Sequence, residues 1–184
     1  FTDGPESGVF RVAPLARLNA SEAMATPLAQ AAREKMYSTL GGSPAHNTLA
    51  YHWARLVELN QAAEAMVELL DDPDLMGDEI RTLPTETPTE GVGVVEAPRG
   101  TLFHRTDERG VIEQANLIVA TVNNAPAICM SIERAARELI KGGHVSEGLL
   151  NMVEMAFRAY DPCFACATHT LPGRMPLVVE VKRA

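Results

Sequence analysis

Two cysteines and a histidine lie close together near the C-terminal end of the sequence. Cys163 and Cys166 have the C-x-x-C spacing, and His169 follows three residues later. A tight turn brings cysteines at this spacing to the same side of the backbone, so that both sulfurs can hold one metal ion. Thiolate ligands favour zinc, iron, nickel or copper over magnesium or calcium. The residue types therefore indicate metal or redox chemistry.

Two general interpretations of this pattern stay open. A structural zinc site normally has four protein ligands, and the remaining cysteine, Cys129, has no cysteine neighbour that could complete such a site. A thioredoxin-like dithiol lies where a strand runs into a helix, whereas here a strongly helical segment ends just before Pro162. Each interpretation thus needs a feature that the local sequence does not supply.

The pattern Asp-Pro-Cys-x-x-Cys-x-x-His at residues 161–169 resembles the C-terminal motif of the large, catalytic subunit of nickel-iron hydrogenases. Further segments resemble the same family in the expected order, namely residues 8–15 with 17–19, 96–100 (Glu-Ala-Pro-Arg-Gly) and 115–121. Several motifs in register are more specific than one C-x-x-C pair. The resemblance covers essentially the whole chain and is strongest to the cytoplasmic, cofactor-coupled branch of the family.

The resemblance implies an activity and its cofactors. The parent protein would catalyse reversible, heterolytic cleavage of H2 at a nickel-iron centre with diatomic ligands on the iron, and would pass electrons to an iron-sulfur small subunit. By position in the motif, Cys163 would be a terminal nickel thiolate and Cys166 a thiolate that bridges nickel and iron. His169 would help to ligate a magnesium ion.

The resemblance also implies which residues surround the metal. Arg99 would lie over the centre with Asp161 as its partner, and we expect these two residues to be catalytic. A guanidinium stays charged and can form two bonds to a carboxylate, so such a pair would fix a cation beside the metal. Glu96, Pro98 and Thr121 are expected to lie around this pair, with Thr121 against a diatomic ligand of the iron.

Two features depart from the family pattern. The family's metal site needs four cysteines, and the other C-x-x-C pair belongs to a region near the N-terminus of the full large subunit that this chain does not contain. Residues 170–184 resemble the tail that a maturation endopeptidase removes after nickel-insertion proteins have acted. We therefore expect residues 1–184 to be a single domain, the unprocessed C-terminal part of a longer subunit, inactive alone and without bound metal.

Two functions of other classes remain as alternatives. A non-catalytic relative, such as the hydrogenase-derived quinone-site subunit of respiratory complex I, would keep the fold without nickel, although the retained Cys163 and Cys166 argue against it. An independent zinc-binding interaction module would use the same cysteines. Chelators would lower the melting temperature of such a module, because metal binding stabilises the folded state.

Composition excludes some classes of protein. The chain has 46% hydrophobic residues, which is typical of a globular domain, and 24 acidic against 16 basic residues, which argues against a nucleic-acid surface. No apolar run approaches the roughly 20 residues of a membrane span. Three cysteines do not make a disulfide framework and fit a reducing compartment. With no signal-peptide pattern, we expect a cytoplasmic protein.

Hydrophobic periodicity predicts a mainly helical α+β fold, a helix bundle with a small antiparallel sheet. Helices are expected over 27–40, from Ser43-Pro44 to residue 70, from about 124 to 141, and over 147–160. Strands are expected at 91–96, 101–105, 111–117 and 175–181. Residues 1–20 and 71–91 are expected to be extended connections, and Cys129 to be buried in the apolar face of its helix.

Overall fold

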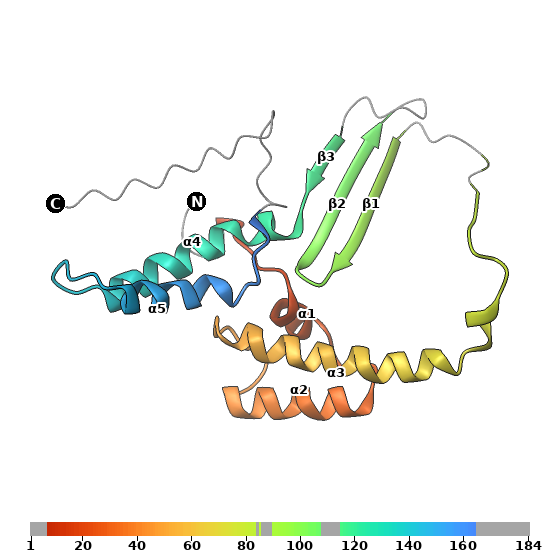
Figure 1. Cartoon of the computed structure of the whole chain (residues 1–184), viewed down its shortest axis with the longest axis horizontal. Helices are drawn as coiled ribbons and strands as arrows, with labels where there is room; N and C mark the ends of the chain where they lie inside the picture. The colour runs from red at the N-terminus through yellow and green to blue at the C-terminus, as the bar shows by residue number, and fades with distance from the viewer. Residues whose placement is uncertain (1–6, 84, 86–89, 108–114, 165–184) are drawn as a thin grey trace.

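The computed structural model describes residues 7–83, 85, 90–107 and 115–164 of the chain. These residues form a mainly helical structure with a three-stranded antiparallel sheet, as the periodicity predicts. Figure 1 shows three N-terminal helices, α1, α2 and α3, in one layer, with the pair α4 and α5 beside them and the sheet projecting away from the helices.

The first helical layer is formed by α1 (Pro14–Ala20), α2 (Pro27–Leu40) and α3 (Ala50–Leu70). Helix α2 begins and ends where the sequence predicts. Pro27 occupies its first turn, where a missing N–H is harmless, and Gly41 follows it in the left-handed conformation with φ 92°. Both α1 and α2 pack against α3 (Figure 1).

The expectation that residues 1–20 are extended is wrong for their second half, because Pro14–Ala20 is helical. Pro14 begins the helix, and Leu15 and Leu18 are buried three residues apart on the face that meets α3. A helix of seven residues shows too few turns for its periodicity to be evident, and it is stabilised by packing rather than by propensity.

Helix α3 begins at Ala50 rather than near Ser43-Pro44. The reason is a contact from α1: the Asn19 side chain donates to the carbonyl oxygen of Ala45 at 2.7 Å and accepts from its N–H at 3.1 Å. Both backbone groups of Ala45 are thereby bonded outside a helix. After α3, a short 3-10 helix (η2, Pro73–Met76) lies within the expected connection.

The sheet has the order β1 (Glu90–Ala97), β2 (Gly100–Asp107) and β3 (Ala115–Ile118). Strands β1 and β2 form a hairpin whose register pairs Ala97 with Gly100, so Pro98 and Arg99 form its turn. The two predicted strands at 91–96 and 101–105 are thus present and slightly longer. The third strand covers only 115–118 among the described residues, and the predicted residues 111–114 lie outside them.

Helices α4 (Ala120–Leu139) and α5 (Glu147–Arg158) run side by side, as Figure 1 shows. Helix α4 begins about one turn before the predicted start at residue 124, and Pro126 lies inside it. Helix α5 begins after Ser146, whose hydroxyl oxygen accepts from the N–H of Leu149 at 3.3 Å. This is the predicted helix cap.

The expectation that Cys129 is buried is wrong, because its side chain is exposed. The buried residues of α4 are Ala120, Thr121, Asn124, Ala127 and Ile128. They follow the helical repeat of three to four residues, and position 129 lies outside this stripe.

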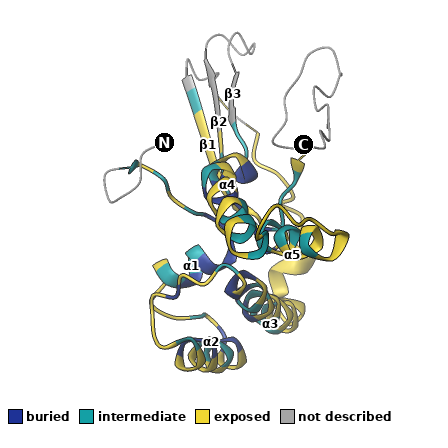
Figure 2. Cartoon of the chain, turned by 90° about the vertical axis from the view of Figure 1, so that its left-hand side faces the viewer, coloured by how far each residue is buried: buried dark blue, intermediate teal, exposed yellow. Residues whose placement is uncertain are grey.

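The hydrophobic core lies where α1, α2, α3, α4 and the segment after α5 meet. Tyr51 of α3 and Tyr160 after α5 are almost fully buried, and their ring centroids are 4.9 Å apart. In Figure 2 the buried residues gather at the contact of α1 with α3 and at the first turn of α4. By contrast, the C-terminal half of α3 exposes Met66, Val67 and Leu70.

Several expectations fall outside the described residues. Cys166, His169, the tail at 170–184 and the predicted strand at 175–181 all belong to the segment 165–184. Within the described part of the chain, no helix combines the length and apolar character needed to cross a membrane.

Candidate metal centre

Cys163 lies where segments far apart in the sequence meet. Its N–H donates to the hydroxyl oxygen of Thr121 at 3.0 Å. Thr121 belongs to the first turn of α4 and is 5% exposed. The N-terminal cysteine of the C-x-x-C pair is therefore attached to a buried position of a neighbouring helix.

Arg99 reaches the same place from the β1–β2 turn. Its Nε lies 3.2 Å from Oδ2 of Asp161 and also donates to the backbone oxygen of Asp161 at 3.1 Å. The structure thus brings together Arg99 and Asp161, as the family resemblance implies, but through one nitrogen rather than through a two-nitrogen fork. The two side chains are 48% and 44% exposed. An ion pair this open contributes only about 0–1 kcal/mol to stability.

Asp161 occupies an uncommon backbone conformation directly after α5. Its φ is 52°, in the left-handed region, and its N–H donates to the carbonyl oxygen of Arg158 at 3.0 Å. Aspartate is one of the few residues other than glycine that adopts this region readily. The following Pro162 also disfavours a right-handed helical conformation at residue 161. Together they end the helix and direct the chain toward α4, where Cys163 is bound.

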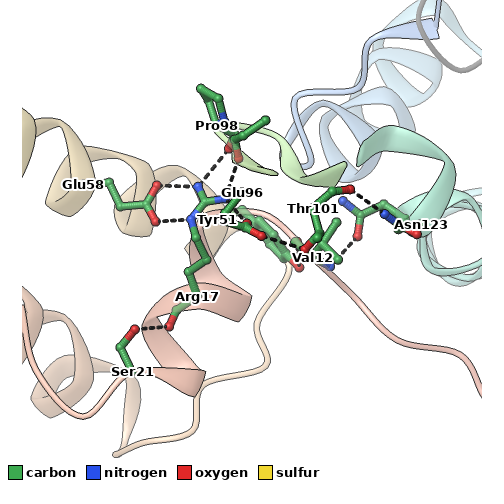
Figure 3. Close-up of polar contacts among 11 residues, drawn as sticks. Val12, Arg17, Ser21, Tyr51, Glu58, Glu96, Pro98, Thr101 and Asn123 are labelled. Carbon is green, nitrogen blue, oxygen red and sulfur yellow. Dashed lines mark hydrogen bonds and ion pairs between the residues drawn. The ribbon is translucent and has the colours of Figure 1, made fainter. Parts of the chain in front are cut away.

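A second arginine holds the turn that carries Arg99. Arg17 of α1 bonds Glu58 of α3 through Nε and Nη2, at 2.7 and 2.6 Å (Figure 3). Its Nη1 donates to Oε1 of Glu96 at 2.6 Å and to the carbonyl oxygen of Ala97 at 2.8 Å. Its Nη2 also donates to the carbonyl oxygen of Pro98 at 2.9 Å. One side chain therefore joins α1, α3 and the turn.

The electrostatics of this cluster favour the charged guanidinium. Burial by itself lowers the pKa of Arg17, but the hydrogen bonds and charges of Glu58 and Glu96 outweigh it and raise the pKa above its ordinary value. Two carboxylates around one cation leave an excess of negative charge, which the backbone carbonyls do not neutralise. Removing Arg17 would therefore leave Glu58 and Glu96 close together without their shared partner.

The other side of the turn is held by close packing of the backbone. Gly100 has φ 128°, and a Cβ atom at this position would lie 2.2 Å from Cγ2 of Val12. The backbone of Val12 is fixed in turn, since its N–H donates to Oδ1 of Asn124 at 2.9 Å and its carbonyl accepts from the Tyr51 hydroxyl at 3.1 Å. Glycine is required here both for its conformation and for space.

Strand β2 is also attached to α4. The side chain of Asn123 donates to the carbonyl oxygen of Thr101 at 2.9 Å (Figure 3). The hydroxyl of Thr101 donates to Oε2 of Glu96, its direct partner across the hairpin, at 2.6 Å. The start of β2, the end of β1 and the first turn of α4 thus form one bonded unit.

The residues expected around the metal differ in what they contact. Thr121 bonds the backbone of Cys163. Glu96 bonds Arg17 and Thr101, and the carbonyl oxygen of Pro98 accepts from Arg17. Glu96 and Pro98 therefore support the turn from the side of α1, whereas Thr121 supports the cysteine.

Sequence reasoning missed the most connected residues of this site: Val12, Arg17, Tyr51, Glu58, Gly100 and Asn124. Arg17 falls within a segment that resembles the hydrogenase family, but its partner Glu58 is 41 positions away and Glu96 is 79 positions away. Asn124 offers one signal, because it is a polar residue, with Thr121, in the mainly apolar buried stripe of α4. Nothing local to these residues identifies their partners.

Comparison with known proteins shows the family. A family model described as nickel-dependent hydrogenase matches residues 6–169. The chain belongs to the nickel-dependent hydrogenase family. It is 49% identical over 183 residues to the beta subunit of the NAD-reducing hydrogenase HoxS of Cupriavidus necator, a match that spans 97% of this chain and 37% of that protein. The predicted resemblance to the large subunit of the cofactor-coupled branch is confirmed.

Other relatives agree. An F420-non-reducing hydrogenase iron-sulfur subunit of Archaeoglobus profundus is 48% identical over 184 residues, covering 98% of this chain and 38% of that protein. The crystal structure of an NAD+-reducing NiFe-hydrogenase in the H2-reduced state matches with a TM-score of 0.84 and 43% identity, over 90% of this chain and 37% of the other. The chain thus spans somewhat more than a third of the length of these relatives.

The residue types at the junction fit a thiolate-bound metal of this family. Cys163 is disulfide-bonded in this structure and would supply a soft donor in its reduced form, with a cation, a carboxylate and a hydroxyl nearby on Arg99, Asp161 and Thr121. Within residues 7–83, 85, 90–107 and 115–164, no group of three or more histidine, cysteine, aspartate or glutamate side chains could hold a metal ion. The ligand set implied by the resemblance therefore extends beyond the described residues.

Proposed function

We propose that this chain supplies half of the thiolates and the overlying arginine of a nickel-iron centre that cleaves H2 reversibly. The observation that carries the proposal is the junction of Arg99, Asp161 and Cys163, which come from the hairpin turn and from the segment after α5. Their contacts connect residues 62 and 42 positions apart in the sequence. The match of the family model over residues 6–169 supports the same interpretation of these positions.

In this proposal, Cys163 and Cys166 would hold the nickel-iron centre, and His169 would help to hold a magnesium ion. The nickel-iron centre supplies the heterolytic cleavage of H2 when bound. Arg99 keeps a permanent positive charge at the junction, and Asp161 fixes the direction of its side chain through the two contacts at Nε. Thr121 holds the backbone of Cys163 and thereby limits where its thiolate can lie.

The remaining parts of the proposal concern partners. Two further thiolates come from the N-terminal part of the same large subunit, and electrons leave through an iron-sulfur small subunit. Nickel-insertion proteins and a maturation endopeptidase act on the C-terminal segment, and the whole assembly works in the cytoplasm. We accordingly expect the 184-residue chain alone to be inactive, since it supplies only two of four thiolates.

The first experiment uses the complete large subunit purified with its small subunit, in which nickel content and H2-dependent reduction of a viologen dye are measured. Cys163→Ser should lose most of the nickel, because a hydroxyl is a poor ligand for it. Arg99→Lys should keep nickel but lose about 100-fold in rate, the cost of losing oriented N–H donors while the positive charge is retained. Arg137→Gln, which changes an exposed arginine paired with Glu133, is the matched control.

Each result has a definite meaning. Normal nickel content and a normal rate in the Cys163→Ser protein would refute the proposed ligand. A wild-type complex that contains no nickel and does not oxidise H2 would favour a scaffold function instead. For the tail, mass spectrometry of the mature large subunit should find a C-terminus at His169, and an intact end at residue 184 in the active enzyme would refute processing.

A further inference from the structure

Arg17 lies on α1, away from the Arg99–Asp161 pair, yet it makes three of its bonds to the turn that carries Arg99 and to the end of β1 just before it. Nη1 bonds the Glu96 carboxylate and the carbonyl of Ala97, and Nη2 bonds the carbonyl of Pro98. The last of these carbonyls belongs to the peptide bond that joins Pro98 to Arg99. A movement of the Arg17 head group would therefore move the backbone next to Arg99.

We propose that Arg17 is a positioning residue: it sets where the β1–β2 turn lies and thereby places Arg99 against Asp161. The proposal rests on the proposed function only for the role of Arg99 in H2 cleavage. The positioning itself follows from the contacts. Glu58 anchors one edge of the guanidinium to α3 through two bonds, and the turn occupies the rest of it (Figure 3).

The chemistry requires arginine at this position. The guanidinium is planar and has five N–H groups in a fixed arrangement, so it can bond a carboxylate on one edge and backbone carbonyls on another at the same time. A lysine ammonium is a single point and cannot reach Glu58, Ala97 and Pro98 together. With the Arg17 side chain 22% exposed, little water is present to replace a lost bond.

Arg99 itself has few contacts that could set its position. Among the described residues its polar partner is Asp161, and the pair is about half exposed. The turn that carries Arg99 is instead fixed at both ends, by Arg17 at Ala97 and Pro98 and by the contact of Gly100 with Val12. The position of Arg99 is thus set by the backbone of the turn, and Arg17 holds the side of the turn that precedes Arg99 in the sequence.

A merely structural role for Arg17 would consist of holding α1 to α3 through Glu58. Arg33 provides a matched comparison, because it is also a half-buried arginine and it bonds the backbone at the end of α1. Its Nη2 donates to the carbonyl oxygens of Leu18 and Ser21 at 3.2 and 2.7 Å, and its guanidinium stacks on Tyr37 at 4.9 Å. A change at Arg33 disturbs the end of α1 without touching the turn.

The test compares Arg17→Gln, Arg17→Lys and Arg33→Gln in the complete large subunit with its small subunit. Hydrogen–deuterium exchange followed by mass spectrometry measures a peptide that contains the turn, residues 97–100, and a peptide from α1. Both Arg17 variants should raise exchange in the turn by about tenfold or more, since charge-assisted bonds to its backbone are lost. Arg33→Gln should raise exchange around α1 and leave the turn unchanged.

Infrared spectra of the loaded enzyme give a second readout, because the diatomic ligands on the iron respond to nearby charge. Arg17→Lys should shift these bands in the same direction as Arg99→Lys, and Arg33→Gln should not shift them. Arg17→Lys keeps the charge and the aliphatic stem, so it remains informative if Arg17→Gln does not fold.

Three outcomes would count against these proposals, and those against the positioning role are distinguishable from the one against the proposed function. Unchanged exchange of the turn in both Arg17 variants, or an equal rise in Arg33→Gln, would overturn the positioning role. A wild-type complex without iron-ligand bands would refute the proposed function, while the exchange data would still decide whether Arg17 fixes the turn.

Discussion

Arg17 contacts the β1–β2 turn and Arg99 belongs to it, but the two side chains are held in different ways. Arg17 is 22% exposed and bonds two carboxylates and two backbone carbonyls. Arg99 is 48% exposed and contacts Asp161 through Nε. The half-buried Arg17 uses its donors to fix the fold, whereas the more exposed Arg99 leaves most of its guanidinium available.

This difference is what a site for an external group requires. A charged residue that acts on a substrate or metal must keep donors unused by the protein, and such a residue contributes little to its own placement. Its geometry must then come from neighbours whose positions are locked by packing and hydrogen bonds. Here those neighbours are Arg17 and Gly100.

The largest effect should come from filling the space under the turn. Gly100→Ala would place Cβ at 2.2 Å from Cγ2 of Val12 and would also strain a backbone with φ 128°. We expect a loss of about 3 kcal/mol in the free energy of unfolding, measured by urea titration. Gly42→Ala is the control, because Gly42 has φ 120° but no atom within 4 Å of its Cβ position. An equal loss in both variants would show that strain alone matters.

Two double-mutant cycles compare the two arginines directly. The Arg17–Glu58 pair should show a coupling energy of about 2 kcal/mol, because two charge-assisted bonds form in a partly buried site. The Arg99–Asp161 pair should show about 0–1 kcal/mol, because its charges are open to water. Unfolding titrations of the single and double alanine variants supply both values. Equal coupling would contradict the proposed division of roles.

Tyr51 extends the comparison to a neutral donor. Its hydroxyl bonds the carbonyl of Val12 at 3.1 Å, and Tyr51→Phe should cost about 1 kcal/mol at neutral pH by removing this bond. Burial raises the pKa of Tyr51 to about 12, with Tyr160 adding to the rise and Arg11, Arg17 and Arg55 opposing it.

The sign of the pH effect follows from that raised pKa. The unfolded tyrosine loses its proton near pH 10 while the folded one keeps it, so this contribution to stability is complete below pH 10 and is lost as the pH rises toward about 12. The difference in unfolding free energy between wild type and Tyr51→Phe should shrink over this range. A constant difference would mean that the hydroxyl is not protected from solvent.

The smallest effect should come from Glu64, whose carboxylate has several partners but lies near water. It accepts from the Thr26 hydroxyl and from the N–H groups of Leu28 and Ala29, at the start of α2. Desolvation acts to raise the pKa of Glu64, but these hydrogen bonds outweigh it and lower the pKa.

A lowered pKa stabilises the fold above the unfolded pKa, and the stabilisation is lost as the pH falls through the folded one. Wild type should therefore exceed Glu64→Gln in melting temperature at neutral pH, and the gap should close below about pH 4.5. If Glu64→Gln lowers the melting temperature as much as Arg17→Gln does, the number of hydrogen bonds, and not burial, decides how much a charged side chain stabilises the fold.

Much of the secondary structure could be predicted from the sequence. Pro27 and Gly41 bound α2, Ser146 begins α5, and alternating residues with Pro98-Arg99 between them indicate the β1–β2 hairpin. These predictions succeed because each depends on local backbone chemistry. The errors occurred where distant contacts override local signals: at Ala45, which Asn19 keeps out of α3, and at Pro14–Ala20, a helix that packing stabilises.

The candidate site divides in the same manner. The sequence by itself determined the C-x-x-C spacing at Cys163, the end of the last helix before Pro162, and the family to which these motifs belong. Only the tertiary structure decided that Arg17 holds the turn and that Thr121 holds the cysteine backbone. The physical reason is range: caps, turns and motif spacing act within a few residues, whereas these bonds join residues that meet only after the helices have packed.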